Sequence, residues 1–495
     1  MMPAFRSIWP RSVLAVGLAV LAGFLVPRFG VAGVGLIIGI VLILAIAYLT
    51  FADPMIGVFA LVFLLPFERL GSIEVAGFTL RSSQVIGLLL LLVWLLRVLL
   101  RKGGRLRSNP TLFIGGLYIV VALLSITQAP NQFRAVTVFG FVTFTILVSW
   151  LIPQFLAEAK QVRRLIAILF VTTTLVGVFG LFQFAGDLVG LPPALTGLRP
   201  QYTSEVFGFP RIQSTFIEPL YYANYLLIPL CLAVSFLLAG VKVARRSLTL
   251  IAIILLWGLN FVLTLSRGGY IALAVAFLVM GVIYWKKILV PHRVIIGAVL
   301  AGVILWGSVQ FLGLTGDRQE SVDVFTRQAT GIFTGASYAD RATTIEDAWV
   351  MFQEHPLLGV GVGNFGPVVA PLALVQPEHG WLIVNNEFLE ILAETGILGF
   401  CAIILLLLIL LIRTVRAIRK ATDPYIRAAL VGLLAAFIGV IIQYQTFSIL
   451  YIMHIWFLFG LMVAVQNVAI APQARHVELC ETSSFKQDSS QARND

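Results

Sequence analysis

The chain is poor in charge and in cysteine, and each shortage narrows what it can be. Only 12% of its 495 residues are charged, 59% are hydrophobic, and the mean hydropathy is +0.99. A soluble domain cannot bury that much apolar surface, so lipid must be the solvent for most of the chain. The three cysteines, Cys231, Cys401 and Cys480, form neither a disulfide framework nor a metal-ligand spacing.

A continuous basic face is also missing. The net charge is +11, but the basic residues stand in short clusters between apolar runs. The positive-inside rule explains such clusters better than nucleic-acid binding does. The sequence shows no internal repeat, so the inverted-repeat pattern of many secondary transporters is not supported. Arg6 and Arg11 precede an apolar run as in a signal peptide, but no small-x-small cleavage site follows Leu25, and we expect an uncleaved first span.

Long apolar runs recur along the chain and predict an all-α fold, a polytopic transmembrane helical bundle of about 12–14 spans. In chain order the expected spans are 12–26, 31–49, 54–66, 84–100, 111–127, 134–152, 164–185, 218–239, 248–265, 269–285, 293–314, 386–412, 427–447 and 449–470. The first and third runs are short and could be tilted, re-entrant or merged with a neighbour.

The basic clusters predict the orientation of these spans. They are Arg97–Arg107, Lys160–Arg164, Lys242–Arg246, Lys286–Arg293 and Arg413–Arg427. All of them fall on one side when fourteen spans start from a cytoplasmic N-terminus, as the positive-inside rule requires. Both termini are then cytoplasmic.

The polar segments suggest a membrane domain over residues 1–470 and a disordered cytoplasmic tail over 471–495, which is rich in Gln, Ser and Asp. Three loops are expected on the side of the membrane opposite the cytoplasm, called the far side here, near 67–83, 186–217 and 315–385. The last is the long polar interruption of the chain. It contains an amphipathic helix and a Gly-rich turn, and it leads into NNEFLEILAETGILGF at 385–400, called the re-entry motif here because the chain returns to the membrane there. Long structured loops often carry function, so we expect this loop to cover a site at the membrane surface.

Charges outside the cytoplasmic clusters are the candidates for function. Arg267, in Ser266-Arg267-Gly268-Gly269, stands at a far-side turn between two spans. It can present a fork of donors to a phosphate or carboxylate, and the glycines let a ligand approach the backbone. The alternative is an arginine that snorkels to lipid headgroups, and the residues alone support both readings equally.

The segment from Arg211 to Pro219 leads directly into a span. Arg211 and Glu218 could pair at the rim, and Pro219 suits the first turn of a helix. Glu218 is explained more simply as a helix N-terminal charge. Asn224, inside the span, is expected to form an interhelical hydrogen bond and not to contact a ligand.

In the long loop, Asp340-Arg341 precedes an expected amphipathic helix. The residues expected to share its apolar face are Ile345, Ala348, Trp349 and Phe352, with Thr343 and Glu346 spaced like a capping box. This face is expected to lie in the membrane interface or to pack on the bundle. The GVGVGN segment at 359–364 resembles a phosphate loop only superficially, because no strand precedes it and no lysine follows. We expect it to be a turn that ties the loop to the bundle.

Histidines are scarce, at five in the chain. His379, in Glu378-His379-Gly380-Trp381, could act as a general base near neutral pH, although a loop histidine is more often simply solvated. His292 is expected in the cytoplasm and His454 inside the last span, and neither has a plausible partner in the sequence.

Three motifs together resemble the O-antigen ligase and polymerase superfamily of bacterial envelope glycan assembly. They are QSTFIEPLYYANYL, LTLSRGGYIALAVAFLV, and a block containing DR, AW, HPLLGVGVGNF and NNEFLEILAETGILG, and they span about residues 210–410. The resemblance implies an inner-membrane glycosyltransferase that needs no cofactor. Its donor would be a glycan on undecaprenyl pyrophosphate at the periplasmic face, and its acceptor another lipid-linked glycan or a lipid A core, with polysaccharide export proteins as further partners.

The resemblance also implies residue roles. Arg267 would hold the pyrophosphate and stabilise its growing charge, with Arg341 and Arg211 as supporting cations. Ser266 and Asn386 are further substrate-binding candidates.

One departure concerns catalysis. The family commonly has His-Asn where this chain has Asn385-Asn386, and that histidine is the proposed activator of the acceptor hydroxyl. His379 or Glu387 could supply the base, Asn385 could orient the hydroxyl, the reaction could rely on leaving-group departure, or the chain could lack transferase activity. The departure favours a polymerase over a ligase. A transporter or flippase and a non-catalytic export subunit are the alternatives outside this class.

Overall fold

The computed structural model describes residues 31–69, 73–75, 78–100, 109–207, 209–242, 247–288, 336–371, 381–448 and 450–470. The expected spans 12–26 and 293–314 and the expected tail 471–495 lie outside these residues. The chain divides into two compact units, unit 1 (residues 1–61 and 85–105) and unit 2 (residues 62–84 and 106–495). The division into a membrane domain and a tail stays a prediction.

Unit 1 contains α2 (Val31–Ala52), most of α3 (Pro54–Leu64) and most of α4 (Ser82–Leu99). Gly57 of α3 packs closely on Thr50 and on Leu90 of α4, because a Cβ at Gly57 would lie 2.7 Å from the Leu90 side chain. Arg97 of α4 donates to the Phe51 carbonyl at 3.4 Å. These contacts join the three helices within the unit.

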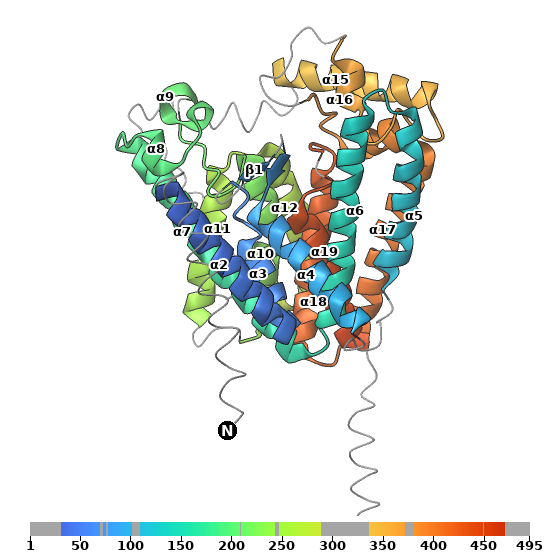
Figure 1. Cartoon of the computed structure of the whole chain (residues 1–495). Coiled ribbons are helices and arrows are strands. Elements are labelled where there is room, and N and C mark those ends of the chain that lie inside the picture. The colour runs from blue at the N-terminus through green and yellow to red at the C-terminus, as the bar shows by residue number, and fades with distance from the viewer. Residues whose placement is uncertain are drawn as a thin grey trace, which may run out of the picture. The chain divides into compact units, whose positions relative to one another are not determined.

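Unit 2 contains most of the helices (Figure 1). They are α5 (Pro110–Ser125), η1 (Ile126–Gln128), α6 (Gln132–Phe155), α7 (Ala159–Leu188), α8 (Pro193–Thr196), η2 (Pro200–Tyr202), α9 (Ser204–Phe207), α10 (Pro219–Ala239), α11 (Ser247–Leu263), α12 (Arg267–Ile288), α15 (Ala336–Glu354), α16 (Phe365–Val369), α17 (Glu387–Lys420), α18 (Pro424–Gln443) and α19 (Met453–Ile470). Strands β1 (Ile73–Val75) and β2 (Phe78–Leu80) form an antiparallel hairpin that pairs Ile73 with Leu80.

The predicted all-α membrane bundle is confirmed. Among the described residues, eight helices are long and apolar enough to cross a membrane, and three shorter apolar helices accompany them. With the uncharged 22-residue α2, they account for each of the twelve expected spans that fall in the described part of the chain. The chain is therefore a multi-pass membrane protein, and its orientation stays a prediction.

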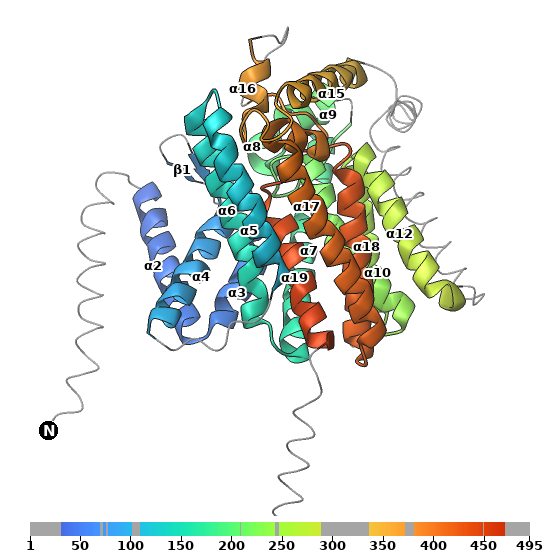
Figure 2. The same ribbon diagram turned by 90° about the vertical axis from the view of Figure 1, so that its right-hand side faces the viewer.

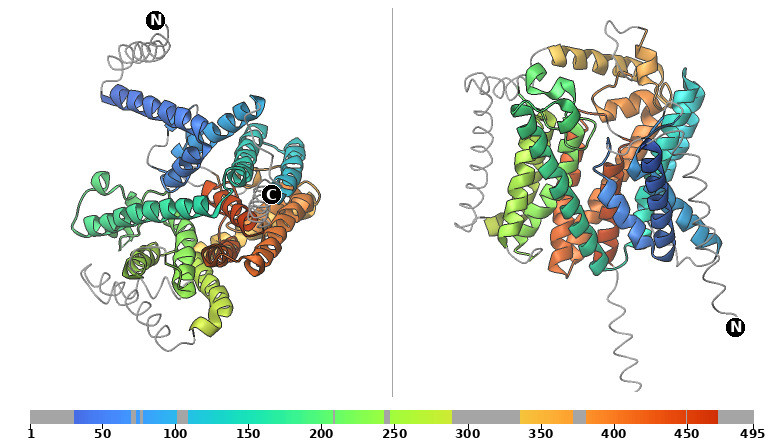
Figure 3. Two further views of the ribbon diagram at one scale, coloured as in Figure 1. Left: turned by 90° about the horizontal axis from the view of Figure 1, so that it is seen from below. Right: turned by 60° about the vertical axis from the view of Figure 1, so that its left-hand side comes forward.

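The centre of unit 2 is formed by α10, α18 and α19, each 78% buried over its apolar window. Seen from below, α19 lies among α6, α17 and α18 (Figure 3). The α10–α18 contact is close, since a Cβ at Gly432 would lie 2.8 Å from the Leu232 Cα. Small residues at such contacts allow dispersion forces to join helices in lipid. By contrast, only 22% of the α12 window is buried against the rest of the described chain.

The two ends of unit 2 differ. The hairpin, α8, α9, α15 and α16 gather at one end, called the upper end here, where α15 and α16 pack across α17 (Figures 1 and 2). At the opposite end Arg163 forms an ion pair with Asp423 at 2.8 Å. Two of the expected cytoplasmic connections therefore meet at the end opposite the expected far-side loops.

One expectation about α15, its start after Arg341 with a capping box, was wrong. The helix begins at Ala336, so Asp340 and Arg341 lie inside it and no capping box stands at Thr343. The buried side chains are Thr344, Ala348 and Met351, whereas Ile345 and Trp349 are 37% and 47% exposed. The small Ala348 lets the helix pack on a cluster that includes Val360, Phe365 and Ala393, and this turns the bulkier neighbours outward.

Candidate functional site

Arg211 and Arg267 come together at the upper end. The Arg211 Nε donates to the Thr264 carbonyl at 2.7 Å, and its backbone N–H donates to the Tyr202 carbonyl at 2.8 Å. Thr264 begins the turn that leads to Arg267, the first residue of α12. Arg267 is an electrostatic neighbour of Arg211. Two of the three predicted cations thus share one site at the start of α12.

Ser266 has a structural role in this turn. Its side chain is 1% exposed, and its Oγ accepts from the Gly269 N–H at 3.3 Å. This satisfies a backbone donor that the first turn of a helix leaves without an intrahelical partner. The other donors and the helix dipole add positive potential beside Arg267. The assignment of Ser266 to substrate binding stays a prediction.

Charge and burial make this end of the bundle suited to an anion. Burial lowers the pKa of Arg211, and the nearby Arg267 lowers it further, while Tyr202 and Glu218 oppose the shift. Burial raises the pKa of Glu218, against the effect of Arg199 and Arg211. Glu218 is the N-cap of α10 without a side-chain capping bond, and Pro219 takes the first helical position as predicted. An anionic ligand would relieve the repulsion between the two arginines.

The connection between α18 and α19 joins this cation pair to the re-entry motif. The Glu387 N–H donates to the Tyr444 carbonyl at 2.8 Å, and Asn386 donates from Nδ2 to Gln445 Oε1 at 3.4 Å. On the other side, a Cβ at Gly268 would lie 2.2 Å from Thr446 Oγ1. Residues 444–446 therefore hold two motifs that are about 120 residues apart in the sequence. The sequence gave no sign of this connection's role.

The re-entry motif itself is tightly built. Asn385 has a φ of +58°, a left-handed conformation that Asn, Asp and His adopt more readily than other side chains. Asn386 caps α17, because its Oδ1 accepts from the Leu389 N–H at 3.1 Å. Glu387 is 2% exposed. The predicted catalytic roles of Asn385 and Glu387 and the binding role of Asn386 stay predictions.

Helix α17 is broken at Gly396, whose φ is +64°. The Gly-rich loop fills the break: the Val360 N–H donates to the Ala393 carbonyl at 2.8 Å, and the Ile397 N–H donates to the Pro356 carbonyl at 2.9 Å. A broken helix at membrane depth needs such partners, because lipid offers none. The expectation that GVGVGN ties the loop to the bundle is confirmed.

Two buried carboxylates fix the loop against α17. Glu394 accepts from the Gly363 N–H at 2.7 Å and from the Phe365 N–H at 3.1 Å. Glu390 accepts from the N–H of Val384, the residue before Asn385, at 3.0 Å. We had not singled out these acids, although carboxylates in an apolar helix are a known sign of a polar partner.

Arg134, at the start of α6, is another cation that we had not singled out. Its guanidinium donates from Nε to the Gly363 carbonyl and lies 5.5 Å from the centre of the Trp381 ring. The ring is 40% exposed. Arg134 thus joins the start of α6 to the Gly-rich loop and to the segment that leads into the re-entry motif.

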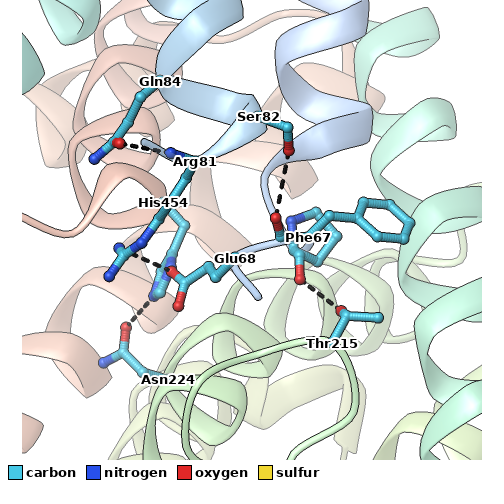
Figure 4. A network of polar contacts seen from close by, with 9 residues as sticks. Phe67, Glu68, Arg81, Ser82, Gln84, Thr215, Asn224 and His454 are labelled. Atoms are coloured by element: carbon cyan, nitrogen blue, oxygen red, sulfur yellow. Dashed lines mark hydrogen bonds and ion pairs between the residues drawn. The ribbon is translucent and has the colours of Figure 1, made fainter. Parts of the chain in front are cut away.

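A buried polar network lies at the same end (Figure 4). His454 of α19 has its Nε2 2.8 Å from Asn224 Oδ1 and its Nδ1 3.6 Å from Glu68 Oε1. Our expectation that His454 has no partner was wrong, because Glu68 comes from a loop almost 400 residues away in sequence. The interhelical role expected for Asn224 is confirmed, since it also donates to Gln443 Oε1 at 2.8 Å.

Two predicted site residues cannot be placed in this geometry. His379 lies outside the described residues. Arg341 falls within α15 by its backbone, and its side chain is not among those described. Their roles as base and as supporting cation stay predictions.

Comparison with known proteins identifies part of the chain. No curated protein matches it. The family model described as O-antigen ligase matches residues 250–404, a range that includes Arg267, the Gly-rich loop and the broken helix. The resemblance inferred from the motifs is therefore confirmed as a match to this family model over residues 250–404.

Proposed function

We propose that the protein is a glycosyltransferase of the bacterial inner membrane that acts at its periplasmic face. It takes a glycan from undecaprenyl pyrophosphate and joins it to an acceptor during surface polysaccharide assembly. The observation that carries the proposal is the bond from Arg211 Nε to the Thr264 carbonyl, which places Arg211 beside the turn that leads to Arg267 at the start of α12, within and beside the matched region. A pyrophosphate is the ligand that such a partly exposed cation pair favours.

In this proposal Arg267 does most of the electrostatic work. As the bond between the sugar and the lipid pyrophosphate breaks, negative charge grows on the leaving phosphate. Fixed donors at that position stabilise the transition state more than the ground state. Arg211 is held by the Thr264 carbonyl and needs little reorganisation to assist. Arg341 is the third cation proposed.

The acceptor hydroxyl also has to lose a proton. Asn385 cannot take it but can orient the hydroxyl, and His379 and Glu387 are the proposed bases. Glu387 is 2% exposed, so it would need the re-entry motif to move before it meets an acceptor. The absent motif histidine therefore favours a polymerase, whose acceptor is another lipid-linked repeat.

A ligase that transfers to a lipid A core is the second candidate. It is supported by the description of the matching family model as O-antigen ligase. Mass spectrometry of lipid-linked glycans from cells with and without the gene separates the two. Single repeat units accumulate on the carrier if a polymerase is lost, and long chains accumulate if a ligase is lost. If neither product accumulates, the result would favour a transporter or an export subunit over a glycosyltransferase.

A variant tests the site directly. Arg267→Ala should reduce glycan transfer about 10²–10³-fold, as the loss of one charge-stabilising donor does in other enzymes. Arg419→Ala, on an exposed arginine near the opposite end of α17, is the matched control and should transfer normally. Unaltered glycan length in folded Arg267→Ala protein would refute the role assigned to Arg267.

A further inference from the structure

Glu68 and His454 are buried ionisable groups that the proposed reaction does not use. Glu68 is 3% exposed and His454 0%. Their side chains and that of Arg81 point toward one another (Figure 4). Buried ionisable groups are costly, so their retention needs a reason.

The hydrogen bonds around His454 define its protons. Asn224 donates from Nδ2 to Gln443, so its Oδ1 is left to accept from the His454 Nε2–H. In a neutral imidazole, Nδ1 is then a bare acceptor that faces the Glu68 Oε1 at 3.6 Å. Within the described part of the chain, neither Nδ1 of His454 nor Oε2 of Glu68 has a hydrogen-bond partner. One proton between the two residues would turn two opposed acceptors into an ion pair, in which Glu68 keeps the negative charge that faces Arg81.

The pair is fastened to the segment that carries the proposed site. The Arg69 N–H donates to the Thr215 carbonyl at 3.1 Å, and Thr215 Oγ1 donates to the Pro66 carbonyl at 2.5 Å. The ring of Phe216 meets His454 edge-on, with centroids 6.1 Å apart. Thr215 and Phe216 lie between Arg211 and Glu218, so the loop of Glu68 and the cation segment are held together.

Arg81 gives the pair a functional output. Its Nη1 lies 4.0 Å from Glu68 Oε1, and its side chain is 23% exposed. The guanidinium is therefore held by Glu68 and remains partly accessible to a ligand. The carboxylate that Arg81 contacts belongs to the loop that the Thr215 bonds hold to the segment between Arg211 and Glu218. Arg81 therefore belongs to the same end of the bundle as Arg211.

We propose that Glu68 and His454 share one proton and form a buried positioning pair, which holds Arg81 as an additional cation for the anionic phosphate group bound at Arg211 and Arg267. The inference rests on the proposed function, because it assigns a further residue to the same pyrophosphate site. It also predicts a loss of thermal stability when the pair is broken, which can be measured without any glycan transfer.

The first experiment measures thermal unfolding of the full chain in detergent. Glu68→Leu leaves His454 Nδ1 buried without a partner and should lower Tm by several degrees. Glu68→Gln should rescue Tm, because its amide can donate to Nδ1 of neutral His454. The control is Asp423→Asn, which weakens the exposed Arg163 pair at the opposite end and should change Tm little. A Glu68→Leu protein as stable as wild type, or a Gln variant as unstable as the Leu variant, would overturn the shared proton.

The second experiment measures binding of inorganic pyrophosphate by calorimetry. Arg81→Gln, a change on a partly exposed side chain, should weaken binding about 10- to 100-fold, as the loss of a charge-assisted hydrogen bond does. Asp423→Asn should bind like wild type. If Arg81→Gln binds pyrophosphate as tightly as wild type, the role of Arg81 is refuted even where transfer is intact. If binding weakens as expected but no glycan is transferred by wild type, the cation site stands and the proposed reaction fails.

Discussion

Glu394 offers a direct test of how the Gly-rich loop is held. Its carboxylate is 9% exposed and accepts two backbone N–H donors, from Gly363 at 2.7 Å and from Phe365 at 3.1 Å. A buried hydrogen-bond donor that is left without a partner costs about 1–3 kcal/mol. Glu394→Ala leaves two such donors and a cavity, so it should lower the free energy of unfolding by about 3–6 kcal/mol.

Glu394→Gln separates the two bonds. Its single carbonyl oxygen can accept from Gly363 or from Phe365, and its NH₂ group then opposes the other donor. We expect roughly half the loss seen for alanine, about 1.5–3 kcal/mol. Glu354→Gln, an exposed change at the end of α15, is the control and should fall within about 0.5 kcal/mol of wild type.

The assay combines thermal unfolding in detergent with amide hydrogen exchange read by mass spectrometry. Exchange is the sharper measurement, because the loss of the carboxylate should deprotect the loop from 359 to 366 before the rest of unit 2. Unchanged exchange of this loop in Glu394→Ala would refute the reasoning, whatever the change in Tm.

Three further changes are predicted to have distinct effects. Gly268→Ala should impair transfer more than folding, since its Cβ would lie 2.2 Å from Thr446 Oγ1 and would push α12 from the α18–α19 connection; comparison of the transfer rate with Tm measures this. Asn385→His should fold, because histidine tolerates φ of +58°, and should raise transfer if the missing group is the base; an unchanged rate would mean that another residue supplies it. Burial raises the pKa of Glu218, so the folded protein binds its proton more tightly than the unfolded chain does, and stability should fall as pH rises from about its usual 4.5. Glu218→Gln should flatten that part of the Tm–pH profile, and an unchanged profile would contradict the assignment.

The spans were predictable because a membrane helix is specified by one property that is local in sequence. About 20 apolar residues satisfy their own backbone and need no distant partner. The same holds for Pro219 at the start of α10 and for the turn before Arg267, where the signal lies in adjacent residues. The packed face of α15 was not predictable to one residue, because the burial of Ala348 depends on a small cluster contributed by another part of the loop.

The polar contacts were predictable only in part, because their partners are far apart in the chain. Asn224 was expected to bond between helices, but nothing local indicates that the partner of His454 is Glu68. The sequence likewise marks Glu394 as an acid in an apolar run without showing that its acceptors are used by the Gly-rich loop. Such pairs depend on which helices pack together, and neither composition nor hydrophobic periodicity predicts that packing.

The conformation of residue 385 bears on why an asparagine can stand where the family commonly has histidine. The backbone there is left-handed, with φ of +58°, and Glu390 fixes the preceding Val384 N–H. Asn and His are both among the few side chains that tolerate this region, so the exchange keeps the turn and the start of α17 while it removes a titratable group. The architecture of the motif and its acid–base chemistry are thus separable. A chain with this motif can keep the cation pair of Arg211 and Arg267, and the pyrophosphate chemistry proposed for it, while the proton of the acceptor is handled elsewhere.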